Sequence, residues 1–205
     1  MQSEQADIVV VCDGGRSLEE FRHFRNIHVT SVAAGAGAQR SRNEGFRYAV
    51  ENFKNPFVLF SDEDVVWKAG AFRQLRRGLE NAPKDVAYSY GDYQRVGALD
   101  EIWIAGEFSP ERLWYDNFIS TMSLLRTECL PSPVWMEDEE RFQDYSLWLR
   151  LLNAGHIGRY VPGVAFTAHY DQFSKSLKPW EHCQYWKSLV RHRYLKRSRE
   201  MLPWR

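Results

Sequence analysis

One short stretch, residues 55–66 with the sequence NPFVLFSDEDVV, constrains this chain more than any other. Its apolar run Phe57–Phe60 has the length and composition of a strand buried on both faces of a parallel sheet. Carboxylates follow the run at once, and they are costly at the mouth of a buried strand unless a positive charge neutralises them. Ligands of open α/β sheets bind at the carboxyl ends of strands. Asp62 and Asp64, spaced as Asp-x-Asp, therefore suit Mg²⁺ or Mn²⁺ on a diphosphate. A solvated acidic turn before a helix explains the stretch equally well.

Size and charge narrow the class of protein. A chain of 205 residues is long enough for one sizeable core, which predicts a single domain. The formal net charge is zero, so nothing global suggests a nucleic-acid partner. Three distant cysteines, Cys12, Cys129 and Cys183, give neither a disulfide framework nor a metal spacing. Without a signal peptide or a membrane-length apolar run, we expect a soluble, cytoplasmic protein. The eight Trp residues fit a sugar or nucleobase pocket, or a ring-rich core.

The first third of the chain predicts a strand, a helix and a strand, which is typical of a parallel βαβ unit. Residues 7–12 form a β-branched run that stops at the tight turn Asp13-Gly14-Gly15. Ser17 and Glu20 make a capping box for a short helix to about Arg25. Residues 27–32 are the next strand.

A stretch of small residues follows, 33–45 with the sequence AAGAGAQRSRNEG, and leads into a helix predicted over residues 41–53. Small side chains let the backbone approach a ligand closely, and Arg40 and Arg42 add positive charge. Gly35-x-Gly37 lacks the third glycine of a dinucleotide fingerprint. Two acidic strand ends flanking an Arg-bearing loop predict a pocket for an anionic nucleotide with its counterion.

The second half alternates helices and strands. We expect helices over residues 69–81, with Phe72, Leu75 and Leu79 on one face, and from Gln143 to just before Gly155. Strands are expected over residues 85–90 and 158–168, and the type of residues 117–125 stays open. Residues 91–110 are expected to form a long loop.

Three features of this half have ordinary structural explanations. Asp144 lies in the first turn of its helix, where the helix dipole favours a carboxylate with no further role. His169 follows a strand, and a lone histidine is more often structural than a ligand. The basic stretch from Trp180 to Leu202 is predicted to be a helix on an anionic membrane surface, against a partner, or simply in solvent.

In order and spacing, these segments resemble the family 2 glycosyltransferases of the GT-A fold over roughly residues 7–176. The resemblance rests on five segments: Asp13-Gly14-Gly15, the run GAQRSRNEG at residues 37–45, LFSDED at residues 59–64, QDYSLWLRL at residues 143–151, and Gly155-x-x-Gly158 with Tyr160-Val161-Pro162. It implies an α/β, GT-A-like, mostly parallel sheet flanked by helices. The single domain would cover residues 1–179, with a nucleotide-binding half at 7–67, an acceptor half at 68–179, and a basic C-terminal helix at 180–205.

The resemblance also implies roles for individual residues. Asp13, with Gly14, would meet the nucleobase, Arg42 would lie by the nucleotide, and Asp62 would contact the ribose or the metal. Asp64, with Asp62 and His169, would hold Mn²⁺ or Mg²⁺ on the donor diphosphate. Asp144 would be the general base toward the acceptor hydroxyl. Trp135, Trp148 and Arg150 would lie on the acceptor side.

Three departures from the family pattern are visible. Only six residues precede Asp7, so the usual first strand–helix unit is expected to be absent, or supplied by another segment or subunit. Gln143 replaces the glutamate before the base. Residues 131–135 lack the glycine usual ahead of the acidic motif.

The resemblance predicts a metal-dependent, inverting hexosyltransferase that uses a UDP- or dTDP-sugar. Its acceptor would be a glycan, a lipid-linked molecule or a protein. A homo-oligomer and peripheral contact of the basic helix with the inner face of a membrane are further expectations. The alternative, prompted by the first departure, is a non-catalytic module that binds nucleotide-sugar or glycan, or a partner subunit. A Rossmann oxidoreductase is disfavoured, because the glycine pattern is incomplete and residues 62–64 would have no task.

Overall fold

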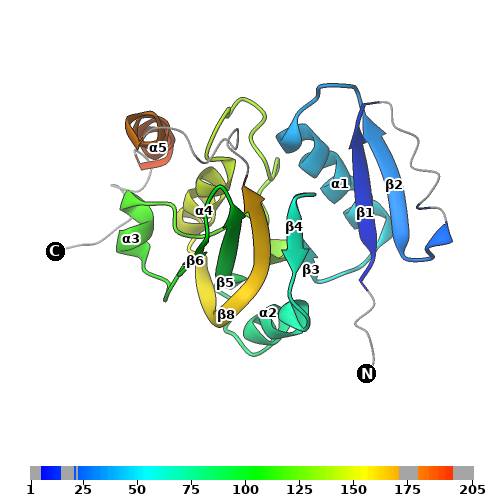
Figure 1. Ribbon diagram of the computed structural model, residues 1–205, viewed down its shortest axis with the longest axis horizontal. Coiled ribbons are helices and arrows are strands. Elements are labelled where there is room, and N and C mark those ends of the chain that lie inside the picture. Colours follow the sequence, from blue (N-terminus) through cyan, green and yellow to red (C-terminus); the bar gives the residue numbers. More distant parts are fainter. Residues whose placement is uncertain (1–5, 15–20, 22, 171–179, 196–205) are drawn as a thin grey trace. The chain divides into compact units, whose positions relative to one another are not determined.

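The strand predicted at residues 7–12 is β1 (Ile8–Asp13), which pairs in parallel with β2 (Ile27–Val32) from Ile8 opposite Ile27 to Asp13 opposite Val32. Helix α1 (Ala38–Asn52) lies against both strands (Figure 1). Gly45 allows this close approach, because a Cβ there would lie 2.9 Å from Cγ2 of Val11. The parallel pairing predicted from the sequence is confirmed.

This computed structural model describes residues 6–14, 21, 23–170 and 180–195. The helix predicted between Ser17 and Arg25 therefore lies mostly outside the described residues. The chain divides into two compact units, which we call unit one (residues 1–56 and 132–140) and unit two (residues 57–131 and 141–205). The expected division into a nucleotide half and an acceptor half is a functional one and stays a prediction.

Unit two is built on a six-stranded mixed sheet. Its strand order is β3 (Phe57–Leu59), β7 (Leu124–Arg126), β5 (Val86–Gly97), β8 (Ile157–Tyr170) and β4 (Val65–Trp67), with β6 (Glu101–Trp103) paired to β5. Strands β5 and β8 are parallel, and the other pairs are antiparallel. The predicted α/β class is confirmed, with a sheet that is mixed rather than wholly parallel. A physical reason is visible at β5 and β6, which a short turn joins and which can therefore only pair antiparallel.

The apolar run after Pro56 is not the central strand that its composition suggested. Residues Phe57–Leu59 are partly buried, and in the described sheet β3 pairs with β7 at the end of the strand order. Phe60, just beyond the strand, is the buried residue of the run.

The prediction of a long loop over residues 91–110 is wrong. Residues 91–97 continue β5, residues 101–103 form β6, and α3 (Pro110–Tyr115) begins at Pro110. Asp92, which favoured a loop, is buried with both carboxylate oxygens satisfied. It accepts hydrogen bonds from the Ala105 backbone N–H (2.9 Å) and the Tyr160 hydroxyl (2.7 Å). A buried carboxylate with two donors is compatible with a central strand.

Helices cover both faces of the larger sheet. On one face, Ser89 of β5 donates to the Leu75 carbonyl of α2 (Ala71–Glu80) at 2.8 Å. On the other face, the Tyr88 ring packs on Trp148 of α4 (Gln143–Asn153), with centroids 4.5 Å apart. Leu75 is buried as predicted, whereas Phe72 is 43% exposed, in contrast to its predicted place on the same face.

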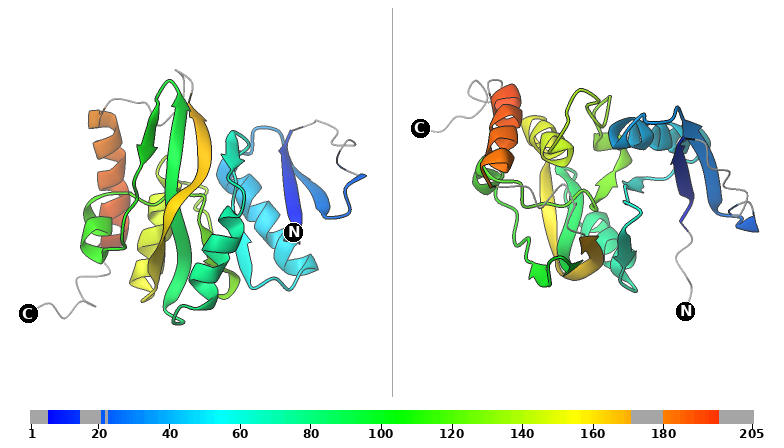
Figure 2. Two further views of the ribbon diagram at one scale, coloured as in Figure 1. Left: turned by 60° about the horizontal axis from the view of Figure 1, so that its bottom comes forward. Right: turned by 45° about the horizontal axis from the view of Figure 1, so that its top comes forward.

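Helix α5 (Trp180–Leu195) lies beside α4 (Figure 2). Residues 196–202 of the predicted helix lie outside the described residues. Lys187 is buried and forms an ion pair with Asp116, so it does not belong to a solvated basic face. A short 3₁₀ helix, η2 (Thr127–Cys129), follows β7. Among the described residues, none of the helices combines the length and apolarity that a membrane span requires.

Candidate functional site

Asp13 ends β1 and organises the small-residue loop of unit one. One carboxylate oxygen accepts from the Ala36 N–H (2.8 Å), and the other accepts from the Gly37 N–H (2.9 Å). The Gly37 and Ala36 N–H groups lower the pKa of the Asp13 carboxyl below its ordinary value. Gly14 has φ +91°, and a Cβ there would lie 2.7 Å from Cβ of Ala34, so only glycine fits. The carboxylate of Asp13 and the close approach of Gly14 thus tie the end of β1 to the loop after β2.

Arg42 and Asn43, in the first half of α1, contact the second segment of unit one. The Arg42 guanidinium lies over the Trp135 ring, 4.8 Å from its centroid. Asn43 Nδ2 donates to the Trp135 carbonyl (2.8 Å), and the Trp135 N–H donates to Asn43 Oδ1 (2.9 Å). Sequence reasoning missed Asn43, because no periodicity or charge marks a single asparagine. Arg42 is also the residue for which a nucleotide contact was predicted.

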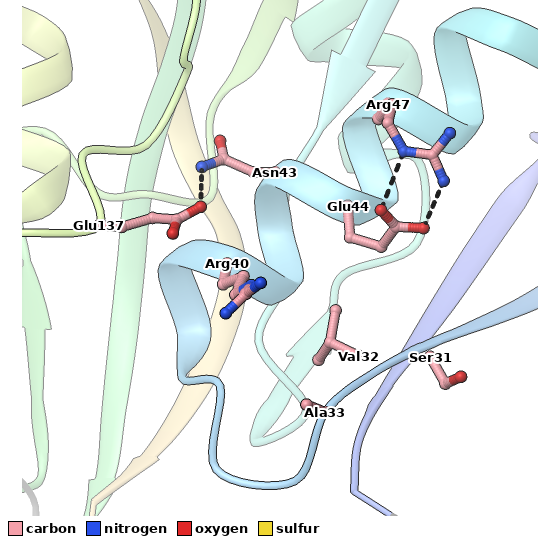
Figure 3. Close-up of a pocket in the computed structure, with 8 residues that line it drawn as sticks. All are labelled: Ser31, Val32, Ala33, Arg40, Asn43, Glu44, Arg47 and Glu137. Atoms are coloured by element: carbon pink, nitrogen blue, oxygen red, sulfur yellow. Dashed lines mark hydrogen bonds and ion pairs between the residues drawn. The ribbon is translucent and has the colours of Figure 1, made fainter.

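A hollow of about 380 Å³ lies at the carboxyl end of β2 beside α1 (Figure 3). It is lined by Ser31, Val32, Ala33, Arg40, Asn43, Glu44, Arg47 and Glu137. Glu44 and Arg47 form an ion pair with a closest contact of 2.7 Å, which lowers the pKa of the Glu44 carboxyl. Neither Asp13 nor Arg42 lines this hollow. Arg40, in the first turn of α1, does line it.

In unit two, the structure brings Asp64 beside His169. Val65 of β4 opposes Ala168 of β8, and the His169 N–H donates to the Asp64 carbonyl (3.2 Å). Burial raises the pKa of the Asp64 carboxyl above its ordinary value, and the negative charge of Asp62 raises it further, whereas His169 lowers it. A bound cation would therefore offset the burial of Asp64 and its repulsion by the charge of Asp62.

The donor types at this position suit a hard divalent cation. Carboxylate oxygens are preferred ligands of Mg²⁺ and Mn²⁺, and an imidazole nitrogen is acceptable to Mn²⁺. The described residues contain no group of three or more His, Cys, Asp or Glu side chains arranged to hold a metal ion. Mg²⁺ commonly needs only one or two protein carboxylates, with water and substrate phosphates as the other ligands. Asp62 and Asp64 fit that smaller requirement.

Asp144 lies in the first turn of α4, as predicted, and is partly exposed. Its Oδ2 accepts a hydrogen bond from Asn117 Nδ2 (3.0 Å), and its Oδ1 accepts one from the Tyr145 N–H (2.8 Å). Phe142, the helix N-cap, has φ +57°, which is rare outside glycine. Sequence reasoning missed Asn117, which lies in the segment whose type was left open.

Two of the three acceptor-side residues lie in buried positions. Trp148 is fully buried in unit two, and its indole N–H donates to the Ile119 carbonyl (3.1 Å). It is a core residue, which corrects the expectation that an acceptor could touch it. Trp135 is 1% exposed and contacts Arg42 and Asn43 in unit one. Arg150, in the last turn of α4, is partly exposed.

Comparisons with known proteins agree with this fold. The family model described as Glycosyl transferase family 2 matches residues 2–120, more than half of the chain. A crystal structure of S. aureus TarS residues 1–349 superposes with a TM-score of 0.61 at 15% identity, covering 96% of this chain and 63% of that one. A second TarS crystal structure gives a TM-score of 0.62 at 16% identity, covering 97% of this chain and 39% of that one. The chain therefore spans less than two thirds of both structures. No curated protein matches it in sequence.

Proposed function

This chain belongs to glycosyltransferase family 2, and we propose that it transfers a sugar from a nucleoside-diphosphate donor to an acceptor hydroxyl with inversion at the anomeric carbon. The observation that carries the proposal is the environment of Asp144, a partly exposed carboxylate at the start of α4 that accepts hydrogen bonds from two N–H donors. Such a group can accept a proton at neutral pH.

In the proposed reaction, Asp144 takes the proton of the acceptor hydroxyl. The oxygen then attacks the anomeric carbon from the face opposite the leaving group, and the bond to the nucleoside diphosphate breaks with its electron pair. Asp144→Asn would lose the base and keep the size of the side chain. General-base removal typically lowers kcat by about 10²- to 10⁴-fold.

We assign separate parts of the donor to individual residues. Asp13 and Gly14 would meet the nucleobase, because each Asp13 oxygen keeps a lone pair beyond its bond to the loop. Arg42 would contribute positive charge by the nucleotide, and Asp62 would contact the ribose or the metal. A UDP- or dTDP-linked hexose is the proposed donor class.

Asp62 and Asp64 would hold Mn²⁺ or Mg²⁺, with water and the donor phosphates as further ligands. When bound, the ion would act as a Lewis acid on the donor diphosphate. The raised pKa of Asp64 supports this assignment, because a cation would offset both its burial and the charge of Asp62. The acceptor, which we propose to be a glycan, a lipid-linked molecule or a protein, would approach Asp144, with Arg150 on that side.

The test is release of UDP or dTDP from UDP-glucose and dTDP-glucose, with Mn²⁺ and a panel of glycan acceptors. We expect activity in the natural chain, a loss of about 10²-fold or more in Asp144→Asn, and no loss in Asp100→Asn. Asp100 is an exposed acid in the turn between β5 and β6 and serves as the matched control. Equal activity in the natural chain and Asp144→Asn would remove Asp144 as the base. No activity with any donor would favour a non-catalytic binding module.

A further inference from the structure

Asn117 is held in a way that packing alone does not explain. Its Nδ2 donates to Asp144 Oδ2 (3.0 Å), while its Oδ1 is buried and has no hydrogen-bond partner in the described chain. A buried acceptor left unpaired is destabilising, so an apolar residue would suit the interior better. What the asparagine adds is the N–H aimed at the Asp144 carboxylate.

The segment that carries Asn117, residues 114–119, is fixed from several sides within unit two. The Tyr145 hydroxyl donates to the Trp114 carbonyl (3.1 Å), Arg191 to the Tyr115 carbonyl (3.4 Å), Lys187 to the Asp116 carboxylate, Trp103 to the Phe118 carbonyl (3.3 Å), and Trp148 to the Ile119 carbonyl (3.1 Å). These donors come from β6, α4 and α5. With its neighbours bonded on both sides, Asn117 has little freedom to turn away from Asp144.

Lys187 of α5 contacts a residue close in sequence to each partner of this pair. Its ammonium group is buried and forms an ion pair with the partly exposed carboxylate of Asp116, the residue before Asn117. It also lies 5.5 Å from the centroid of the Phe142 ring, at the N-cap of the helix that carries Asp144. One cation therefore contacts the chain next to Asn117 and the chain two residues before Asp144.

We propose that Asn117 is a positioning residue for Asp144, and that Lys187 of the C-terminal helix holds the two segments at the required spacing. The inference rests on the proposed function, in which Asp144 is the base. Asn117 would select one orientation of the carboxylate, and neither Asn117 nor Lys187 needs to touch the substrate. It also gives α5 a role other than contact with a membrane.

A structural experiment tests the first half without any substrate. Crystal structures of the natural chain and of Asn117→Ala would be compared at the Asp144 side chain. We expect one Asp144 rotamer in the natural chain, and a rotated or multiple one in Asn117→Ala. The matched control is Asn153→Ala, because Asn153 also lies on α4, also donates to a carbonyl (Tyr194, 3.2 Å), and also has a buried, unpartnered Oδ1. An unchanged Asp144 rotamer in Asn117→Ala would overturn the proposal.

Kinetics separate positioning from general destabilisation. With UDP-glucose, dTDP-glucose and Mn²⁺, we expect Asn117→Ala to lower kcat by about 10-fold or more and to leave the donor KM nearly unchanged. In an Asp144→Asn background the same substitution should change kcat by less than about 2-fold, because the two residues act as one unit. Asn153→Ala should keep the natural kcat. A natural kcat in Asn117→Ala, or an equal loss in both backgrounds, contradicts positioning. Full activity of Asp144→Asn alone would instead refute the proposed function.

Lys187→Met tests the second half, with Lys84→Met, an exposed lysine, as its control. We expect kcat to fall about 5-fold or more in Lys187→Met and to stay natural in Lys84→Met. If Lys187→Met does not fold, Asp116→Asn weakens the same ion pair while keeping the lysine stem. Natural kcat in the folded variant, with an unchanged Asp144 rotamer, would remove Lys187 from the proposal.

Discussion

Asn43 joins two segments of unit one that lie 92 positions apart. Its side-chain amide forms two hydrogen bonds with the backbone of Trp135, one as donor and one as acceptor, as a peptide group of a paired strand would. Alanine would leave a buried donor and a buried acceptor without partners. Because each such loss is destabilising by about 1–3 kcal/mol, we expect Asn43→Ala to reduce the free energy of unfolding by roughly 2–6 kcal/mol.

Urea unfolding measures this effect as a lower midpoint at constant slope. Asn52→Ala is the control, because Asn52 is exposed and donates to the Tyr48 carbonyl of its own helix. Its change should stay within about 0.5 kcal/mol. Equal effects of the two substitutions would mean that the Trp135 contacts contribute nothing specific.

The hydrogen bonds that Asp13 accepts from the loop after β2 should make the stability of this loop depend on pH. The Gly37 and Ala36 N–H groups hold the pKa of Asp13 below its ordinary value of 3.8. A depressed pKa means that the carboxylate stabilises the folded loop above the ordinary carboxyl range, and that this contribution is lost as the pH falls through the lowered pKa. The amide shifts of Ala36 and Gly37, followed by NMR, should therefore titrate with a midpoint below 3.8. A midpoint at or above that value would show that these bonds do not form in solution.

At the residue scale, the positions of the acidic residues could be predicted from the sequence, whereas the hydrogen-bond partners of polar residues could not. Asp13, Asp64 and Asp144 stand out as acids at strand ends or a helix start, because strands and helices have recognisable periods. Asn43 and Asn117 do not stand out, since their role depends on segments far away in the chain. Trp148 was expected on the acceptor side and is buried in the core. The sequence does not distinguish these two positions, because an aromatic residue at helical spacing is compatible with both.

Helix α4 begins from an unusual backbone conformation. Phe142, its N-cap, has φ +57°, where a side chain crowds the following carbonyl. Glycine has no such penalty, although it also lacks the ring that Lys187 contacts. We therefore compare two variants that both lose the ring. Phe142→Gly should be more stable to urea than Phe142→Ala by about 1 kcal/mol. An alanine variant as stable as the glycine variant would show that the turn relaxes to negative φ without loss.

Among the elements, those with a clear period were predicted well. Helix α4 begins at Gln143, as its apolar spacing predicts, and the residues 27–32 strand has the predicted bounds. Residues 91–97 of β5 were missed because Gly91 and Asp92 look like a turn. In the structure Gly91 faces the carbonyls of Val161 and Gly163, where a Cβ would come within 3.2 Å and 3.1 Å, beside a break in the β5–β8 register. Only the partner strand explains both residues, and a single strand's sequence does not contain its partner.

For the whole molecule, the order of motifs along the chain predicted the family, which the match over residues 2–120 confirms. The α/β class followed from the alternation of strands and helices. The mixed pairing in unit two did not, because short strands such as β3, β4 and β7 have three residues each and carry no signal for direction. Several aromatic residues belong to the core of unit two, where Tyr88, Tyr90 and Trp148 are buried.

The proposed donor predicts a linkage between ligand binding and the stability of the chain. A ligand that binds only the folded protein, present at about 100 times its Kd, stabilises it by about 2.7 kcal/mol. For a chain of this size, that corresponds to a rise in Tm of roughly 5–10 °C. We expect UDP with Mn²⁺ to give such a shift, and UDP with EDTA to give a smaller one, because Asp62 and Asp64 repel the diphosphate when no cation is present.

Substitutions then assign the shift to residues. Asp64→Asn should remove its dependence on Mn²⁺, Asp13→Ala should reduce the shift from UDP at every metal concentration, and Asp144→Asn should leave both unchanged, since the base meets the acceptor rather than the donor. Differential scanning fluorimetry of the four proteins, each with Mn²⁺ alone as a reference, measures all three effects. A UDP shift that is identical with Mn²⁺ and EDTA, and equal in the natural chain and Asp64→Asn, would show that the acids between β3 and β4 do not bind the donor's metal.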